Sequence, residues 1–225
     1  MCSLVQRLLP SRERVCRARD SPGRKCLGVC PRGLRRLAQK GVLELPVGGH
    51  IAQPITVADV KYEETSSLSG SSLQLNGAGV RYKAVFKVYT AGLYLEKKAS
   101  TPAEIMALKG PKRMSITMLR EIDSTELGKL FSRGMEDNMD RAAFSKLIPG
   151  VLRMSQIFSD HKKLQAGDQF MIDWIPGTGT VITVKGKPQG EPFKEPEFFN
   201  ALLGIWLGNV PADWKLKDAL LCKPA

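Results

Sequence analysis

The sequence predicts an α+β domain in which helices pack on one face of a mainly antiparallel sheet. Three observations support this class: short strands precede the first helix, a hairpin with a glycine-rich turn follows the central helices, and two more helices close the chain. The chain has 225 residues, of which 43% are hydrophobic, enough for one core. We expect a leader in residues 1–52 and one folded domain in residues 53–225.

The first elements of the predicted domain are strands. Residues 55–62 and 72–75 are expected as short strands around a serine-rich turn, and a longer strand-like run covers residues 80–96. Closely spaced glycines open this run and permit a backbone excursion. Gly92 marks a bulge or a close approach of another part of the chain.

The later elements are helices interrupted by one strand and one hairpin. Sequences typical of capping boxes, Thr101 to Glu104 and Asp123 to Glu126, begin two helices. The predicted elements are helices over 102–109 and 123–139 with a strand over 114–118 between them, helices over 141–146 and 150–164 separated by Pro149, a hairpin over 170–185, and helices over 196–207 and 211–221.

The net charge of +12 is concentrated at the amino terminus. Residues 1–40 hold 11 Lys and Arg against Glu13 and Asp20, which leaves 23 basic and 20 acidic residues in positions 41–225. The predicted domain has no cluster of arginines and aromatics, so we expect no nucleic-acid binding. The leader lacks the apolar core of a secretory signal. It is either an organellar transit segment or sequence that is not translated as written.

Metal, cofactor and membrane-spanning roles are not expected. Four of the five cysteines lie in the first 30 residues, Cys222 stands alone near the end, and the two histidines are far apart. No cofactor motif is present, because the glycines near residue 179 are not followed by the Lys and Ser or Thr of a phosphate loop. No window approaches 18 consecutive apolar residues, so no membrane span is predicted.

No catalytic motif emerges from the residues alone, and Arg81 is the side chain that invites a functional interpretation. In an unbroken strand Arg81 and Tyr89 would share a face with Lys83 and Lys87, which favours a solvated charge. Either a bend or bulge separates the pair from the lysines, or the lysines lie at a rim. Asn138 lies on an apolar helix stripe and is also compatible with a helix cap or a structural amide.

A resemblance adds a family to this pattern. The string Gly77-Ala78-Gly79-Val80-Arg81, followed by Thr90-Ala91-Gly92-Leu93-Tyr94-Leu95-Glu96, resembles the chalcone isomerase family, and more closely its bacterial chalcone isomerase-like members. Residues 131–138, 167–183 and 204–221 also resemble it, so the likeness covers about residues 54–222. It implies an open-faced β-sandwich, a large antiparallel sheet with helices on one face and a ligand cleft between them. Because such bacterial members commonly carry an export signal, it also implies a periplasmic or exported location, although no signal is visible.

The resemblance also implies site residues. The plant enzymes of the family close a chalcone to a flavanone with an arginine and with threonine, tyrosine and asparagine groups. Carried onto this chain, the arginine falls on Arg81, the asparagine on Asn138, the strand threonine on Tyr89 with Thr90 as the adjacent alternative, the helix tyrosine on Phe131 and the late-helix threonine on Ile205.

Two of these hydroxyls are absent from the chain. Losing one preorganised donor at developing negative charge costs about 3 kcal/mol, so efficient chalcone cyclisation is not expected. An arginine with a tyrosine resembles the pair with which non-catalytic fatty-acid-binding relatives grip a carboxylate. We therefore expect a non-catalytic binder of a small lipophilic carboxylate such as a fatty acid. The alternatives are an isomerase (intramolecular lyase) acting on an unknown enone with Arg81, and a structural or interaction protein with an empty cleft; the oligomeric state stays open.

Overall fold

The computed structural model describes residues 54–222, so the predicted leader lies outside the described residues. Its main sheet has seven strands in the order β11-β10-β9-β6-β5-β4-β3, and every neighbouring pair is antiparallel. The strands are β3 (Thr65–Leu68), β4 (Ser71–Lys83), β5 (Phe86–Leu95), β6 (Lys112–Met118), β9 (Gln169–Ile175), β10 (Gly179–Val184) and β11 (Lys187–Pro188). Two short pairs accompany it, β1 (Ile55–Val57) with β2 (Val60–Tyr62) and β7 (Ile122–Asp123) with β8 (Lys163–Leu164).

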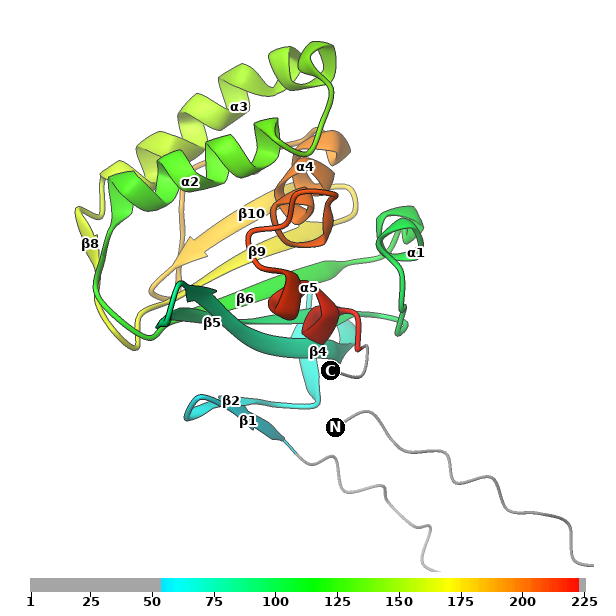
Figure 1. Ribbon diagram of the computed structural model, residues 1–225. Helices are drawn as coiled ribbons and strands as arrows, with labels where there is room; N and C mark the ends of the chain where they lie inside the picture. Colours follow the sequence, from blue (N-terminus) through cyan, green and yellow to red (C-terminus); the bar gives the residue numbers. More distant parts are fainter. Residues whose placement is uncertain (1–53, 223–225) are drawn as a thin grey trace, which may run out of the picture. The chain divides into compact units, whose positions relative to one another are not determined.

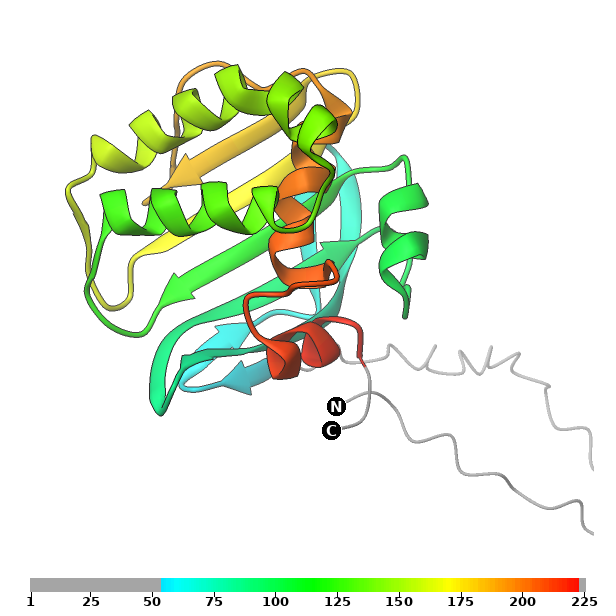
Figure 2. The same ribbon diagram turned by 45° about the horizontal axis from the view of Figure 1, so that its top comes forward.

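Helices cover one face of this sheet, which confirms the predicted α+β class (Figure 1). They are α1 (Pro102–Ala107) at the edge of the fold, α2 (Ser124–Glu136) and α3 (Arg141–Ser159) side by side, and α4 (Pro196–Leu207) and α5 (Trp214–Leu220) near the carboxyl end. The β1–β2 hairpin lies on the opposite face, and the turned view shows the same layers (Figure 2).

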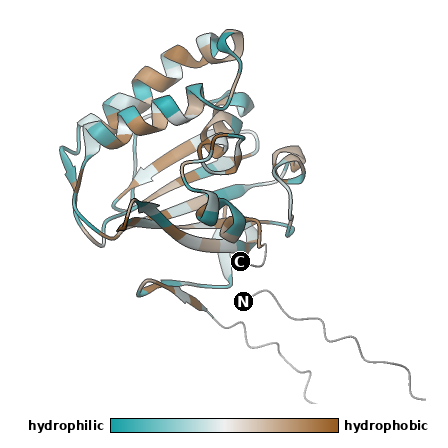
Figure 3. Cartoon of the chain, in the orientation of Figure 1, coloured by the Kyte–Doolittle hydropathy of each residue, from teal (hydrophilic) through white to brown (hydrophobic). Residues whose placement is uncertain are grey.

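An aromatic cluster lies between the sheet and the helices. The ring of Phe131 on α2 lies 5.4 Å from the rings of Phe158 and Trp206 and 5.8 Å from that of Phe170. Hydrophilic and hydrophobic positions alternate along α2 and α3 (Figure 3), as expected of helices with one buried face. The Phe131–Phe158 and Phe131–Trp206 pairs are edge to face, an arrangement that stabilises a core by about 0.5–1.5 kcal/mol per pair beyond the area it buries.

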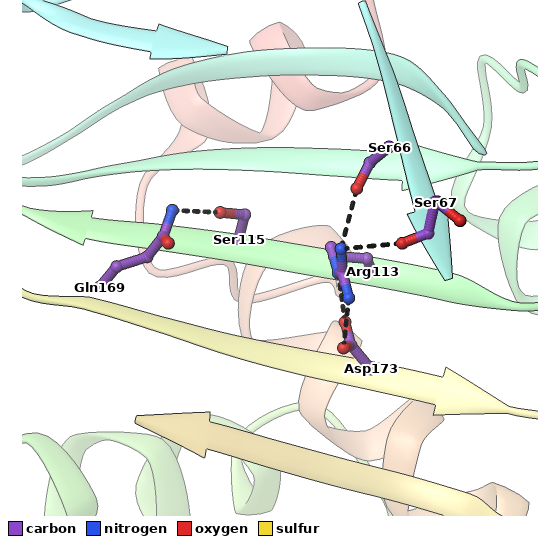
Figure 4. A network of polar contacts seen from close by, with 6 residues as sticks. All are labelled: Ser66, Ser67, Arg113, Ser115, Gln169 and Asp173. Atoms are coloured by element: carbon purple, nitrogen blue, oxygen red, sulfur yellow. Dashed lines mark hydrogen bonds and ion pairs between the residues drawn. The ribbon is translucent and has the colours of Figure 1, made fainter. Parts of the chain in front are cut away.

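The opposite face of the sheet carries a second, smaller core with a buried ion pair. Arg113 donates to both carboxylate oxygens of Asp173, at 2.7 and 2.8 Å, and also to the hydroxyl of Ser66 and the carbonyl of Ser67 (Figure 4). Both charged side chains are largely buried. Bidentate pairing satisfies the guanidinium fork where water is excluded, which ties β3 to the centre of the sheet.

The run over residues 80–96 is a hairpin, and the prediction of one strand was wrong. β4 ends at Lys83, a two-residue turn of Ala84 and Val85 follows, and β5 begins at Phe86 opposite Lys83. Ala84 adopts a positive φ of 55°. The turn lacks the glycine, asparagine or proline that normally marks such a connection, so the local sequence did not predict a turn at this position.

The predicted helix break at Pro149 was also wrong, because α3 continues through this residue. Pro149 lacks an N–H and removes one hydrogen bond from the helix ladder. Residues on both sides of it, such as Leu147, Val151 and Met154, bury one continuous stripe against the core. This tertiary packing outweighs the local cost of the proline.

Candidate ligand-binding cleft

Arg81 and Tyr89 lie directly opposite each other on β4 and β5. The register shifts just after them, because Tyr82 pairs with Lys87 and leaves Val88 as an extra residue on β5. This β-bulge turns Tyr89 toward the helices on the same face as Arg81. The Cζ atom of Arg81 lies 5.6 Å from the centre of the Tyr89 ring.

The bulge also separates the pair from the lysines. Lys87 pairs with Tyr82 and thus lies on the opposite face from Tyr89, while Lys83 sits at the exposed end of the hairpin. Neither lysine therefore shares the cleft with Arg81: the bulge places Lys87 on the other face, and Lys83 lies at the rim.

Helix α5 packs directly on β4 beside Arg81, and the glycines of the family string allow it. A Cβ atom at Gly79 would lie 2.7 Å from the Cβ of Ala219, and one at Gly77 would collide with the carbonyl oxygen of the same residue. Neither glycine has a positive φ, so close packing is the reason for them, not an unusual backbone conformation. Asn76 fixes the helix end by donating to the Leu220 carbonyl at 2.7 Å.

A cavity of about 160 Å³ opens where Arg81 and Tyr89 meet α2 and the connection between α4 and α5. Its lining combines the predicted pair with apolar side chains and two charges near the surface. The lining residues are Arg81, Tyr89, Leu127, Leu130, Phe131, Arg133, Gly134, Asp137, Ile205, Val210, Pro211 and Ala212.

Tyr89 is a neutral hydrogen-bond donor in this cavity. Its phenol oxygen accepts a hydrogen bond of 2.9 Å from Nε1 of Trp206, and only 1% of the residue is exposed. Burial raises the pKa of Tyr89 to about 12, although the nearby charge of Arg81 opposes this shift. Because the indole can only donate, the phenol O–H is left to point elsewhere, and no described residue accepts a hydrogen bond from it.

The guanidinium of Arg81 has a similar unused donor. Its Nε atom is buried, and no acceptor among the described residues pairs with it. A buried donor without an acceptor costs about 1–3 kcal/mol, so such groups are rare and often functional. Arg81 and Tyr89 therefore both line the same small space, and each carries a donor that no described residue uses.

The other predicted site residues divide into two groups. Phe131 and Ile205 line the cavity and make it apolar. Thr90 faces the other side of the sheet, where its hydroxyl accepts a hydrogen bond of 2.8 Å from Tyr62. Asn138 lies just beyond α2 and does not line the cavity; its amide bridges the backbone of Gly134 and Val210. Its position holds the α4–α5 connection beside the cleft.

Trp206 and the α4–α5 connection were missed by sequence reasoning. Trp206 is one residue from the predicted Ile205, inside a helix that is apolar on all sides, so the pattern gave no reason to pair it with a tyrosine. Leu127 and Gly134 lie four residues before and three residues after Phe131, so helical spacing alone could have identified them, and Leu130 lies three residues after Leu127.

A larger cavity, of about 550 Å³, lies at the other end of β4 and β5. Lys97, Lys98 and Glu104 are among its lining residues, together with Asn76 and Leu221. The Glu104 carboxylate already accepts from the backbone of Ser100 and Thr101, as the predicted capping box requires. This cavity lacks the buried, unpaired donors that distinguish the cleft at Arg81.

The family model for chalcone isomerase-like proteins matches residues 54–222. The chain belongs to the chalcone isomerase-like family. A solved structure of an Arabidopsis thaliana fatty-acid binding protein matches with a TM-score of 0.58 and 16% identity, covering 75% of this chain and 96% of that one. At this identity the match shows the fold alone. No curated protein was found to match the sequence at a significant level.

The family assignment confirms the resemblance, whereas the bacterial branch stays a prediction. Within residues 54–222, no three His, Cys, Asp or Glu side chains are grouped closely enough to hold a metal ion. None of the helices in that part of the chain is long and apolar enough to cross a membrane.

Proposed function

We propose that this chalcone isomerase-like protein binds a small lipophilic carboxylate, such as a fatty acid, in the cleft between the sheet and α2. The observation that carries the proposal is the pair of unused donors. The buried Nε–H of Arg81 and the O–H of Tyr89 border one cavity, and no described residue accepts a hydrogen bond from either group. A carboxylate supplies two acceptor oxygens and a charge opposite to that of the guanidinium.

The protonation state of Tyr89 supports this role. Because the pKa of Tyr89 is raised to about 12, the phenol keeps its proton throughout the physiological pH range. It is therefore a hydrogen-bond donor to an anion and not a second negative charge beside it. Trp206 fixes the phenol oxygen, so donation to a ligand needs no reorganisation of the side chain.

The remaining lining suits an acyl chain. Phe131, Ile205 and Leu127 present apolar surface beside the donors. The volume of about 160 Å³ is smaller than the roughly 300 Å³ at which drug-sized ligand pockets begin, and equals the share of about five water molecules. A carboxylate with its first few carbons would fill it, and a longer chain would extend past Leu130 and Val210 toward solvent. The fatty-acid binding protein that shares the fold supports the same ligand class.

Chalcone cyclisation is less well supported by the same geometry. Thr90 faces away from the cavity, the Asn138 amide is engaged by backbone groups, and the positions of Phe131 and Ile205 carry no hydroxyl. Tyr89 is the one hydroxyl among the lining residues. A single donor beside an arginine falls short of the set that the family's plant enzymes use.

Titration calorimetry of the purified full chain with dodecanoate tests the proposal. Hydrogen bonds to charged groups contribute about 1.5–3 kcal/mol, so Arg81→Ala should weaken binding by roughly 10- to 150-fold. Arg141→Ala is a matched control, because Arg141 is exposed at the start of α3 and away from the cavity. Dodecanol has the same chain length but no carboxylate, so it should bind weakly to Arg81→Ala and to Arg141→Ala alike.

Equal dodecanoate affinity of wild type and Arg81→Ala would overturn the proposal. A chalcone incubated with the protein reports on the rival activity through loss of its visible absorbance. Turnover well above the uncatalysed rate would favour the isomerase instead.

A further inference from the structure

Several large apolar side chains are exposed around the mouth of the cleft. Val85 and Phe86 at the tip of the β4–β5 hairpin are 83% and 59% exposed, Val210 is 57% exposed and Trp214 at the start of α5 is 61% exposed. Scattered single apolar residues are normal on a protein surface, but a group beside a cavity marks a contact site. Val210 itself lines the cavity, and Trp214 follows it by four residues in the chain.

A hydrogen bond connects the β4–β5 hairpin to the start of α5. The backbone N–H of Tyr82 donates to Asp213 at 2.8 Å, which places the residue before Trp214 against β4, one residue from its end. Phe86 pairs with Lys83 across the turn. In Figure 2 the closed end of the hairpin extends toward the lower left past α5, which lies over the strands to its right.

Cations accompany these apolar side chains. The guanidinium of Arg120 lies 5.4 Å from the Phe86 ring, and the ammonium of Lys217 lies 4.9 Å from the Trp214 ring. Lys83 and Lys215 are exposed beside them. We call Val85, Phe86, Val210 and Trp214, with Lys83, Arg120 and Lys215, the mouth surface.

Two carboxylates, one at the start of α5 and one that lines the cavity, already have partners. Asp213 accepts hydrogen bonds from the backbone of Tyr82, Lys215 and Leu216 as the cap of α5. Asp137 forms an ion pair of 3.7 Å with Arg133. The charged residues of the mouth surface as defined, Lys83, Arg120 and Lys215, are all exposed and all positive.

We propose that the mouth surface docks on anionic lipid bilayers, so that the ligand passes between the cleft and the membrane. The passage of ligand between cleft and membrane rests on the proposed function, whereas docking itself needs no ligand. Aromatic side chains favour the boundary between head groups and acyl chains, and each Lys or Arg near an anionic leaflet adds attraction. Apolar groups on a hairpin tip, accompanied by cations such as Arg120 and Lys83, match this boundary, and a lipophilic carboxylate is itself concentrated in bilayers.

The test uses tryptophan quenching by brominated phospholipids. Full-length protein is mixed with equimolar phosphatidylcholine and phosphatidylglycerol vesicles whose acyl chains carry bromine. Trp214 is exposed, Trp206 is buried in the core and Trp174 is half-buried on β9. We expect quenching in the wild type and its loss in Trp214→Phe, which keeps an aromatic at the surface but removes the reporter.

Because the basic leader is present in every sample, only changes in the folded domain are compared. Phe86→Asp should lower the apparent vesicle affinity by at least about tenfold, because it places a charge where an aromatic would insert. Leu152→Asp is the matched control, since Leu152 is 66% exposed on α3 and distant in sequence from the mouth surface. Lys83→Gln should lower affinity by about fivefold on anionic vesicles and have no effect on phosphatidylcholine alone.

Three results would overturn the proposal. These are absence of quenching in the wild type, equal vesicle affinity of Phe86→Asp and Leu152→Asp, and a wild-type dimer that Phe86→Asp dissociates without any vesicle effect. The last result would assign the surface to a second copy of the chain. Dodecanoate calorimetry separates this outcome from failure of the proposed function, because Phe86→Asp leaves Arg81 and Tyr89 unchanged.

Discussion

Removing the phenol oxygen of Tyr89 should affect both stability and ligand binding. Tyr89→Phe leaves Nε1–H of Trp206 buried without its acceptor. An unsatisfied buried donor costs about 1–3 kcal/mol. For a domain of 150–250 residues each kcal/mol lowers the melting temperature by about 2–4 °C, so the expected loss is about 2–12 °C.

A double-mutant cycle measured by urea unfolding attributes this loss to the hydrogen bond. In a Trp206→Phe background the donor is absent, so adding Tyr89→Phe should cost no more than about 0.5 kcal/mol. Dodecanoate binding should also weaken by roughly 10- to 150-fold in Tyr89→Phe, because one donor to the carboxylate is lost. Unchanged unfolding free energy together with unchanged affinity would refute the reasoning about both roles of the phenol.

Three other changes test the packing and charges of the fold. Burial lowers the pKa of Lys112 to about 8, below its ordinary value of about 10.4, so the unfolded state binds more protons between these pH values. The free energy of unfolding, measured with urea, should therefore rise from pH 8 to pH 10.4. Lys112→Met should be more stable than the wild type at pH 7 and should not show this rise. A wild-type stability that does not change with pH in this range would contradict the prediction. Gly77→Ala should destabilise the protein by about 1–3 kcal/mol through its collision with the Ala219 carbonyl, and a change below 0.5 kcal/mol would mean that α5 shifts freely. Arg113→Ala should cost about 3–5 kcal/mol because it leaves the Asp173 carboxylate buried and unpaired, and a cost typical of a surface pair, under about 1 kcal/mol, would show that water reaches it.

Elements of the fold were predicted correctly from the sequence where local signals and tertiary packing favour the same structure. The last long helix was predicted over residues 196–207, and α4 covers the same residues because a proline begins it and its side chains are buried on all sides. The α2 cap at Asp123 and the hairpin of β9 and β10 were predicted for similar reasons. The errors at Pro149 and at the Ala84 turn arose where packing overrode propensity or where no turn residue was present.

Only part of the candidate site could be predicted from the sequence. Family resemblance pointed to Arg81 and left Tyr89 and Thr90 as adjacent alternatives. Strand alternation could not choose between them, because the extra residue Val88 changes which side chains share a face. The Trp206 hydrogen bond joins positions 117 residues apart, and no pattern of local spacing contains that information.

A crystal structure of the complex with dodecanoate tests the central claim most directly. We predict that the carboxylate oxygens lie about 2.7–3.2 Å from Nε of Arg81 and from the phenol oxygen of Tyr89, with the chain running toward Leu130. A carboxylate bound instead in the larger cavity beside Lys97 and Lys98, or left in solvent with Arg81 and Tyr89 uncontacted, would contradict it.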